Sequence, residues 1–508
     1  MVSRITTVAF SGIETTPVDV QVSISPGLPA FTIVGMADKP VAESRERVRA
    51  ALAALGLPLP AKKILVNLAP ADLIKEGSHF DLPIALAVLM GMGVLPADEL
   101  ERFVAVGELS LDGAIAPVSG VLPAAIAAKT ADKGFICPAV CGAEAAWAGD
   151  DLEILAPPTL LSLLNHFKGA QVLSPPVCAV AAPAHRGPDL SEVKGQQLAK
   201  RALEIAAAGG HNLLMIGAPG AGKSMLAACL PGILPPMSAQ EILEVSMIAS
   251  IAGEISDGKL SHARPFRDPH HSSSQAAMVG GGRRALPGEI SLAHNGVLFL
   301  DELPEFPRGV LESLRQPLET GEVTVARAQA HVTYPANMQL IAAMNPCRCG
   351  YVADPARACS KAPRCAGDYQ AKLSGPLLDR IDMHIEVMPV ESWSMMDDSV
   401  SETSEAVARR IADARALQQQ RYSGTKARHN ADASGDLLQQ TALLDADAKA
   451  LLEQGVSHFA LSMRGLTRVI RVARSIADLA QSETVNKTHM AEALSYRALN
   501  ETPRAQAS

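Results

Sequence analysis

The sequence predicts an α/β protein built on a parallel sheet, and three apolar runs carry this prediction. Residues 212–216 form a short apolar run that leads into a glycine-rich loop and then into a helix-forming run. Residues 296–300 and 339–344 are two further apolar runs, each followed by a polar side chain. Short, continuously apolar runs are typical of strands buried on both faces of a parallel sheet.

The loop after the first run matches the phosphate-binding pattern G-x-x-x-x-G-K-[ST] at every fixed position. Its glycines let backbone N–H groups turn toward a β-phosphate, and the following helix adds the positive end of its dipole. Lys223 is predicted to reach the β- and γ-phosphates of ATP, and Ser224 to hold Mg²⁺. The predicted nucleotide-binding residues of this loop are Gly217, Ala218, Pro219, Gly220, Ala221, Gly222, Lys223 and Ser224. The alternative is a chance glycine-rich turn, which the flanking strand and helix disfavour.

The second apolar run ends in Asp301 and Glu302, an acid pair that fits a site for ATP hydrolysis. Asp301 is predicted to act on Mg²⁺ through its water shell, and Glu302 to orient and deprotonate the attacking water. Asn345 follows the third run, where an amide can hold the same water and sense the γ-phosphate. A buried strand capped by two solvated acids is the alternative, and the phosphate loop upstream counts against it.

Length and composition set the outer limits of the prediction. A chain of 508 residues is long enough for roughly three domains. The net charge of −8 argues against a wholly basic nucleic-acid coat but permits a local basic channel. No stretch approaches the ~20 apolar residues of a membrane span, and the N-terminus lacks the apolar core of a signal peptide. We therefore expect a cytoplasmic protein without membrane contacts.

Residues 1–170 are predicted to form a compact α/β domain. Strand-like and helix-forming runs succeed one another in it, with strands at 18–22, 31–34 and 64–68 and helices at 41–55 and 82–92. Their order and the loops between them resemble the Lon-protease-like (ribosomal S5 domain 2-like) fold.

A Lon-type protease requires a serine nucleophile whose proton a nearby lysine manages. Residues 75–81, which include Ser78, stand where the serine loop belongs but lack its Pro-Ser-Ala-Gly sequence. Residues 117–122 stand where the lysine belongs and contain none. A serine without its base is inert, so we predict that this domain is not proteolytic.

The rest of the chain is divided by composition. Residues 171–188 are rich in proline and are predicted to be a linker, because proline sustains neither a helix nor a central strand. Residues 189–390 hold the nucleotide-binding motifs and are predicted to be the ATPase core. Residues 391–508 are predicted to form a helical lid, with helices at 401–420, 445–454, 463–481 and 487–499.

Residues 287–302, 373–382 and 462–468 resemble the magnesium-chelatase-like branch of the AAA+ ATPases. With the Lon-like domain in front, the chain resembles the ComM/YifB family over nearly its whole length. The resemblance implies a P-loop AAA+ core with a parallel sheet and a C-terminal helical lid. It also implies a homo-hexamer that uses ATP to drive DNA branch migration in natural transformation and homologous recombination.

By this resemblance Arg380 is an arginine finger that enters the nucleotide site of the neighbouring subunit. A guanidinium there spreads positive charge over the oxygens of the transferring phosphoryl group. The alternative for Arg380 is an ion pair with Asp379 or Asp382. Arg464 opens a helix-forming run and is implied to be the second nucleotide sensor on the lid.

Two insertions are predicted to grip DNA through phosphate contacts that do not read bases. Residues 264–284 are basic and non-periodic, and residues 323–334 alternate as a β-hairpin does. The predicted DNA-binding residues are Arg264, Arg267, Arg283, Arg284 and Arg327. The alternative is that these arginines contact neighbouring subunits or nucleotide.

Four of the eight cysteines crowd into residues 347–365. Cys347, Cys349, Cys359 and Cys365 could close a tetrahedral Zn²⁺ site, which would be structural because four thiolates leave no open position. The spacing is not a standard zinc-ribbon pattern, so a set of reduced cysteines is the alternative.

The function predicted from the sequence is ATP hydrolysis coupled to the movement of DNA strands or junctions through a ring. Three alternatives stay open. A metal-chelatase motor would share the ATPase residues and would need partner subunits. A Lon-like ATP-dependent protease is disfavoured by the missing serine–lysine pair. A nucleotide-gated scaffold would bind ATP with negligible turnover.

Overall fold

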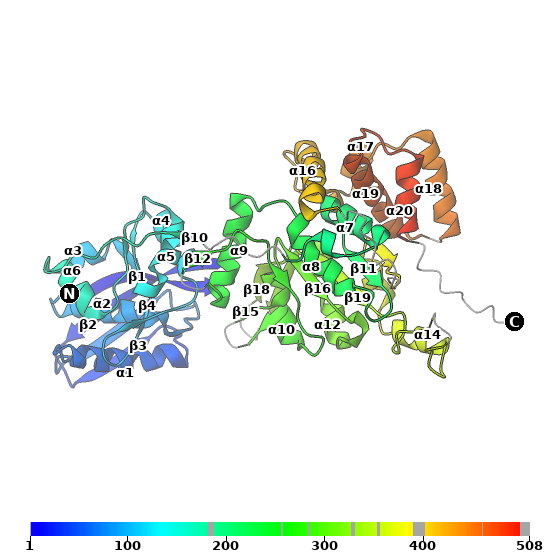
Figure 1. The fold of residues 1–508 in the computed structure, drawn as a ribbon. Helices are drawn as coiled ribbons and strands as arrows, with labels where there is room; N and C mark the ends of the chain where they lie inside the picture. Colours follow the sequence, from blue (N-terminus) through cyan, green and yellow to red (C-terminus); the bar gives the residue numbers. More distant parts are fainter. Residues whose placement is uncertain are drawn as a thin grey trace.

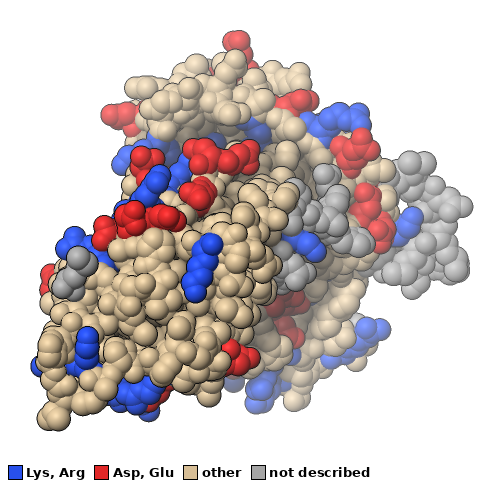
Figure 2. Space-filling model, turned by 90° about the vertical axis from the view of Figure 1, so that its left-hand side faces the viewer, with Lys and Arg blue, Asp and Glu red and all other residues tan. Residues whose placement is uncertain are grey.

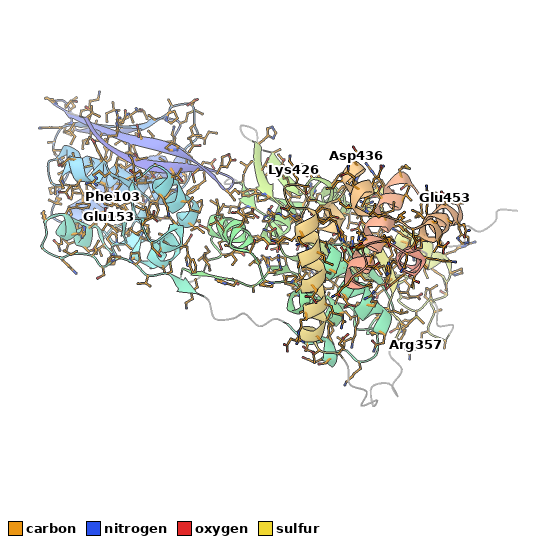
Figure 3. All side chains as sticks on the ribbon, turned by 90° about the horizontal axis from the view of Figure 1, so that it is seen from above. Phe103, Glu153, Arg357, Lys426, Asp436 and Glu453 are labelled. Atoms are coloured by element: carbon orange, nitrogen blue, oxygen red, sulfur yellow. The ribbon has the colours of Figure 1, made fainter. Side chains whose placement is uncertain are left out.

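The computed structural model describes residues 2–180, 187–255, 258–282, 285–326, 331–352, 356–389, 402–459 and 461–497. Three parts follow one another along the molecule: an N-terminal α/β domain, a central α/β domain and a C-terminal group of helices (Figure 1). Seen from above, the N-terminal domain with Phe103 and Glu153 lies at the opposite end from the helices that carry Asp436 and Glu453 (Figure 3).

The N-terminal domain is built on a seven-stranded mixed sheet of order β3-β4-β2-β1-β5-β8-β9. Its strands are β1 (Val2–Ser11), β2 (Glu14–Ser25), β3 (Ala30–Val34), β4 (Lys63–Ala69), β5 (Phe103–Ala105), β8 (Gly134–Ile136) and β9 (Ile154–Leu155). The main helices are α1 (Lys39–Ala54), α2 (Asp81–Gly91), α4 (Val121–Thr130) and α6 (Leu160–Phe167). The predicted strands and helices of this region are confirmed in kind, but the sequence analysis assigned no element to β1, which lies inside the sheet.

The central domain contains a five-stranded sheet of order β13-β16-β19-β11-β20, in which every pair is parallel. The strands are β11 (Leu213–Ile216), β13 (Phe266–Arg267), β16 (Val297–Leu300), β19 (Gln339–Met344) and β20 (Met383–Glu386). The three predicted apolar runs are therefore β11, β16 and β19, side by side in the middle. The edge strands β13 and β20 were not predicted.

Helices cover this sheet and join it to the C-terminal part. The helices of the central domain include α7 (Gln197–Gly209), α8 (Lys223–Ile233), α9 (Ala239–Ala252), α12 (Arg308–Ser313), α13 (Pro317–Thr320) and α15 (Gly375–Leu378). The C-terminal helices are α16 (Ser404–Arg421), α17 (Gly435–Thr441), α18 (Ala446–His458), α19 (Met463–Leu479) and α20 (Lys487–Ser495). One apolar core contains both Leu213 of the sheet and Val472 of α19, so the C-terminal helices are packed firmly on the central domain.

A β-hairpin projects between α13 and β19. Strands β17 (Glu322–Ala326) and β18 (His331–Pro335) pair antiparallel, which confirms the predicted hairpin. The hairpin begins directly after α13, and the N–H of Ala336 donates to the carbonyl of Gly321 at 2.7 Å, which closes its base.

The segment predicted as a linker, residues 171–188, contains a two-residue strand, β10 (Ala179–Val180). It pairs in parallel with β12 (Lys259–Leu260) of the central domain. A second link joins α9 to α4, because the N–H of Gly120 donates to the carbonyl of Ser250 at 2.9 Å. The N-terminal domain is therefore held to the central domain at two places.

Among the helices of the described chain, none combines the length and hydropathy needed to span a membrane.

Candidate active site

The carboxyl edge of the central sheet gathers the predicted nucleotide-binding residues. Because all five strands run in parallel, the loops that follow β11, β16 and β19 meet at this one edge. The phosphate loop, residues 217–222, joins β11 to α8. Gly220 and Gly222 adopt the left-handed region, with φ of 79° and 88°, which side-chain-bearing residues rarely occupy. The loop therefore turns its backbone N–H groups toward the start of α8, as an anion site requires.

Lys223 lies folded against its own loop. Its Nζ donates to the carbonyls of Gly217 and Ala218 at 2.7 and 3.0 Å and to Oδ1 of Asn345 at 3.2 Å. Burial lowers the pKa of Lys223, and the carboxylates of Asp301 and Glu302 partly offset this effect. The lysine is thus held at the edge by neutral oxygens that a phosphate can replace.

Ser224 and Asp301 form a pair of oxygen donors. The Ser224 hydroxyl donates to Oδ2 of Asp301 at 2.7 Å. A hydroxyl and a carboxylate at this spacing suit Mg²⁺, which prefers oxygen ligands and keeps several waters. The two residues come from α8 and from the end of β16, so the fold rather than the sequence brings them together.

Glu302 has an unusual backbone. Its φ of 52° lies in the left-handed region, and its N–H donates to Oδ1 of Asp301 at 2.8 Å. Non-glycine residues in this region cost free energy and are concentrated at functional sites. The Glu302 side chain is 48 % exposed, which leaves its carboxylate accessible to an attacking water.

The loop after β13 adds two groups that the sequence analysis missed at this site. Nδ1 of His271 lies 3.3 Å from Oε2 of Glu302, and burial together with the nearby Asp301 raises the pKa of Asp268. The sequence analysis counted this loop with the basic insertion. A two-residue strand leaves almost no sequence signal, so only its pairing with β16 reveals the position.

Arg380 lies at the opposite, amino edge of the sheet. It stands just before β20, next to Asp382, which accepts from the N–H of Asn212 at 2.9 Å directly before β11. Its side chain is nearly buried and forms an ion pair with Glu319. Among the described ion pairs Arg380 has none with the expected alternative partners, Asp379 and Asp382, and Asp382 lies 2.9 Å from Nε of Arg468 instead.

Arg464, at the start of α19, lies on the same side as Arg380. Its Nη2 is 3.4 Å from Oε1 of Glu319. Both arginines line a cavity of about 1070 Å³ between the central domain and the C-terminal helices. Strand β11 spans four residues, or about 13 Å, so these arginines are separated from the phosphate loop of their own chain by the depth of the sheet.

Two of the five predicted DNA-binding arginines lie among the described residues, and both form ion pairs with carboxylates. Arg264 pairs with Glu241 at 3.0 Å, and Arg267 pairs with Glu289 at 2.6 Å and with Glu254 at 3.1 Å. These carboxylates offset the charge that a phosphate contact would use. The other three predicted residues, Arg283, Arg284 and Arg327, lie outside the described residues. The face that looks out from the N-terminal end shows Lys and Arg scattered among Asp and Glu (Figure 2).

Three of the predicted metal ligands come together in the described part of the chain. The sulfurs of Cys347, Cys349 and Cys365 lie within 4.8 Å of one another, as thiolates about 2.3 Å from one zinc ion would. Backbone hydrogen bonds at Tyr351 and Cys359 lower the pKa of Cys349 to about 6. Burial, followed by a hydrogen bond with Cys359, raises the pKa of Cys365 to about 12. Cys359 is thus a neighbour of the group although its sulfur is not within it.

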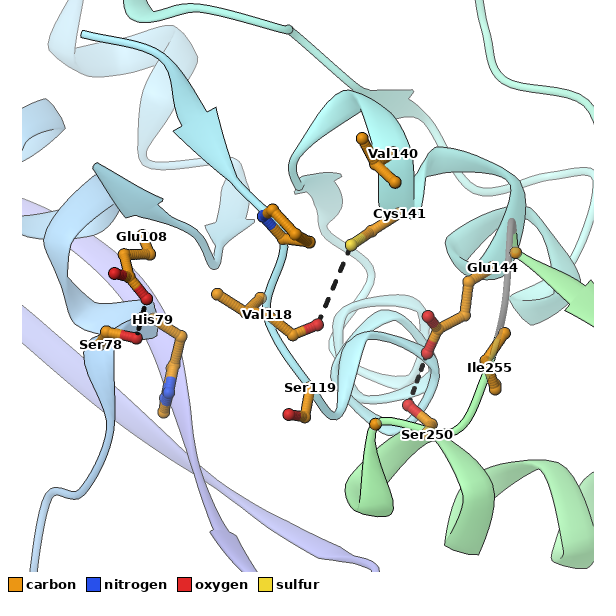
Figure 4. A pocket seen from close by; sticks show the side chains of 13 residues that line it. Ser78, His79, Glu108, Val118, Ser119, Val140, Cys141, Glu144, Ser250 and Ile255 are labelled. Atoms are coloured by element: carbon orange, nitrogen blue, oxygen red, sulfur yellow. Dashed lines mark hydrogen bonds between the residues drawn. The ribbon is translucent and has the colours of Figure 1, made fainter. Parts of the chain in front are cut away.

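A second pocket, of about 290 Å³, is lined by residues of the N-terminal domain and of the central domain (Figure 4). Ser78 donates to the carboxylate of Glu108, and Ser119 lies across the pocket. Lys75, three residues before Ser78, donates to the carbonyl of Pro70. Glu144 accepts from the Ser250 hydroxyl of α9 at 2.5 Å, so the pocket lies where the two domains meet. Among the described residues at this pocket, Ser78 and Ser250 are bonded to the carboxylates of Glu108 and Glu144.

Comparison with known families covers most of the chain. The family described as magnesium chelatase, subunit ChlI, matches residues 189–395. Residues 20–140 match subunit ChlI of Mg-chelatase, and residues 401–497 match the ChlI C-terminal family.

Individual relatives extend over nearly the full length. YifB of Salmonella typhimurium is 43% identical over 97% of this chain and 96% of the relative. Competence protein ComM of Haemophilus influenzae is 42% identical over 97% of this chain and 96% of the relative. The magnesium-chelatase 38 kDa subunit of Rhodobacter capsulatus is 25% identical over 60% of this chain and 87% of the relative.

Two substitutions separate nucleotide binding from hydrolysis. Lys223→Ala is expected to weaken ATP binding severely, because it removes the cation of the phosphate loop. Glu302→Gln is expected to retain binding and to lower kcat by about 10²- to 10⁴-fold, because the shape survives and the base is lost. Nucleotide titration and steady-state turnover measure the two effects. Glu305→Gln, which changes a nearby carboxylate paired with Lys372, serves as the control. Equal turnover in Glu302→Gln and the wild type would refute the role of Glu302.

The cysteine group predicts a bound metal. Elemental analysis of the purified protein is expected to find about one zinc ion per chain. Cys349→Ser should lower this content, whereas Cys178→Ser, which changes a cysteine elsewhere in the chain, should not. A metal-free protein with full stability and activity would show that the cysteines are simply reduced thiols.

Proposed function

The chain belongs to the magnesium chelatase subunit ChlI-like family, together with YifB and ComM, and we propose that it is a ring-forming ATPase that moves DNA. Its ATPase domain is the central domain, and its substrates are ATP with Mg²⁺ and water. The observation that carries the proposal is the gathering of Lys223, Ser224, Asp301 and Glu302 at one edge of the sheet.

Each of these residues has a separate task in hydrolysis. Lys223 exchanges its loop carbonyls for the phosphate oxygens and neutralises their charge. Ser224 and Asp301 would hold Mg²⁺, which would supply positive charge to the phosphates during hydrolysis. Glu302 removes a proton from the attacking water, and Asn345 fixes that water from the end of the neighbouring strand β19.

The site needs a second subunit. Arg380 and Arg464 are the cations suited to stabilise the transferring phosphoryl group, and they lie at the amino edge of their own chain. We propose that they serve the nucleotide of the neighbouring subunit. Such a head-to-tail contact generates a closed ring when the rotation between subunits closes, and we propose a hexamer. In finer terms, the central domain is an AAA+ core and the N-terminal domain a Lon-like, non-proteolytic fold.

DNA is the proposed partner. The relative named competence protein ComM supports a role in the uptake or recombination of DNA, and we propose branch migration during natural transformation. The β17–β18 hairpin is the element best placed to couple hydrolysis to movement, because it leads directly into β19 and Asn345. Arg283, Arg284 and Arg327 remain the candidate phosphate contacts. Arg264 and Arg267 are left out because their charges are paired within the chain.

A chelatase motor is the second candidate. It is favoured by the similarity to the 38 kDa magnesium-chelatase subunit, which covers 60% of this chain. The near full-length similarity to ComM favours the DNA motor instead. The two candidates differ in what stimulates turnover, since only a DNA motor should respond to nucleic acid.

The shared site predicts complementation in mixed rings. Arg380→Ala removes the arginine side of each contact, and Lys223→Ala removes the phosphate side. Mixing the two inactive variants should restore turnover, because some contacts then carry both intact halves. ATPase assays across mixing ratios measure this recovery. Turnover that never exceeds that of either variant, under conditions where subunits exchange, would rule out action between subunits.

The proposed partner predicts that DNA stimulates ATP hydrolysis. Duplex and four-way-junction DNA should raise kcat regardless of base composition, because contacts to phosphates carry no sequence information. Affinity should fall with a log–log salt slope of about −0.9 for each neutralised phosphate. Arg327→Ala should flatten the slope by about one such step, whereas Arg315→Ala, which breaks an exposed pair with Glu312, should not. Turnover that ignores DNA but rises with chelatase partner subunits would favour the second candidate.

A further inference from the structure

We propose that Glu319 is a positioning residue that holds Arg380 and Arg464 in the free subunit and yields them to the phosphates of the neighbour's nucleotide. The proposal rests on the function proposed above. In this proposal Glu319 controls when the two arginines are free to bind phosphate, although Glu319 itself binds neither phosphate nor metal.

Glu319 stands between the two arginines. It belongs to the short helix α13, and its carboxylate contacts Nη2 of Arg380 through one oxygen and Nη2 of Arg464, at 3.4 Å, through the other. The hydrogen bond with Arg380, followed by the charges of both arginines, lowers the pKa of Glu319. The carboxylate is therefore ionised at neutral pH, and one acid neutralises part of the charge of two bases.

The hydrogen bonds of Arg380 make Glu319 an obstacle to phosphate binding. Nη1 of Arg380 donates to the carbonyl of Pro376 at 2.7 Å, and Nη2 is bonded to Glu319. Nε is buried and meets no acceptor among the described residues. To grip a phosphate with the same face of its guanidinium, Arg380 must exchange Glu319 for the phosphate oxygens.

A carboxylate and a phosphate cannot share the arginines. Both are anions, and they repel each other more strongly in a partly desolvated site than in water. The Glu319 side chain is 51 % exposed, while that of Arg380 is 8 % exposed. The acid is thus the mobile partner, and the incoming phosphate displaces it into the solvent of the cavity.

Other acids near the cavity do not take this role. Asp382 is bound to the N–H of Asn212 and lies 2.9 Å from Arg468. Asp432, which also lines the cavity, accepts from the N–H groups of Arg428 and His429, both at 2.9 Å. Among the described ion pairs, those of Arg380 and Arg464 are both made with Glu319.

The position of Glu319 in the sequence connects the exchange of Glu319 for phosphate at Arg380 to the β17–β18 hairpin. Helix α13 ends at Thr320, Gly321 accepts the bond that closes the hairpin base, and β17 begins at Glu322. A shift of Glu319 therefore acts at the base of the β17–β18 hairpin. By this route, the nucleotide of one subunit can reach the DNA-gripping element of the next.

The test is Glu319→Gln, which keeps the shape of the side chain and removes its charge. We expect KM for ATP to fall about two- to fivefold, the range for an exposed ion pair, with a smaller change in kcat. The Kd of a fluorescent ATP analogue for the assembled protein should fall in parallel. Glu312→Gln, which removes the exposed pair with Arg315, should change neither value. In a background that carries both Arg380→Ala and Arg464→Ala, Glu319→Gln should lose its effect.

The outcomes separate this inference from the function it rests on. An unchanged or raised KM and Kd in Glu319→Gln, in rings of normal size and with an active wild type, would overturn the role of Glu319 alone. A wild type that binds the analogue without turnover would overturn the ATPase, and the Kd comparison would still decide on Glu319. A lowered Kd that persists when Arg380 and Arg464 are both replaced by Ala would also overturn it, because the effect would then pass through neither arginine.

Discussion

The shared direction of the five central strands is the constraint on which the rest of the site depends. It brings the phosphate loop, the acid pair and Asn345 to the carboxyl edge of the sheet. It also carries Arg380 and Asp382 to the amino edge, because they precede a strand instead of following one. One subunit therefore presents the two halves of the chemistry on opposite sides, about the length of a strand apart.

The parts that the sequence could predict are those whose chemistry is local. The phosphate loop, the acids after β16 and the hairpin each lie within one short segment with a periodic or glycine-rich pattern. Strands β13 and β20 were not predicted from the sequence, because they are short edge strands. Each is defined by its pairing with a neighbouring strand. The contacts of Glu319 with Arg380 and Arg464 could not be predicted from the sequence for a related reason. Glu319 is 61 positions from Arg380 and 145 positions from Arg464 in the sequence, and a local sequence pattern cannot indicate a contact between residues so far apart.

In the N-terminal domain, the serine that stands where a nucleophile is expected is bonded to an acid. Ser78 and Ser119 line one pocket, and Ser78 is bonded to Glu108. The same pocket receives Ser250 of the central domain, and burial raises the pKa of Glu144, its partner there. The contacts of Ser250 with Glu144 and with the N–H of Leu122 thus join the N-terminal domain to the central domain through helix α9.

The separation of the two edges has a consequence for assembly. If Arg380 and Arg464 serve the neighbour's nucleotide, as proposed, an open string of subunits ends in one nucleotide site that no neighbour's arginines complete. Its other end carries one pair of arginines with no phosphate to bind. Closing the string into a circle removes both defects at once, without any new kind of contact. Closure would then complete every nucleotide site, and the smallest ring that the subunit shape allows would do so with the fewest subunits.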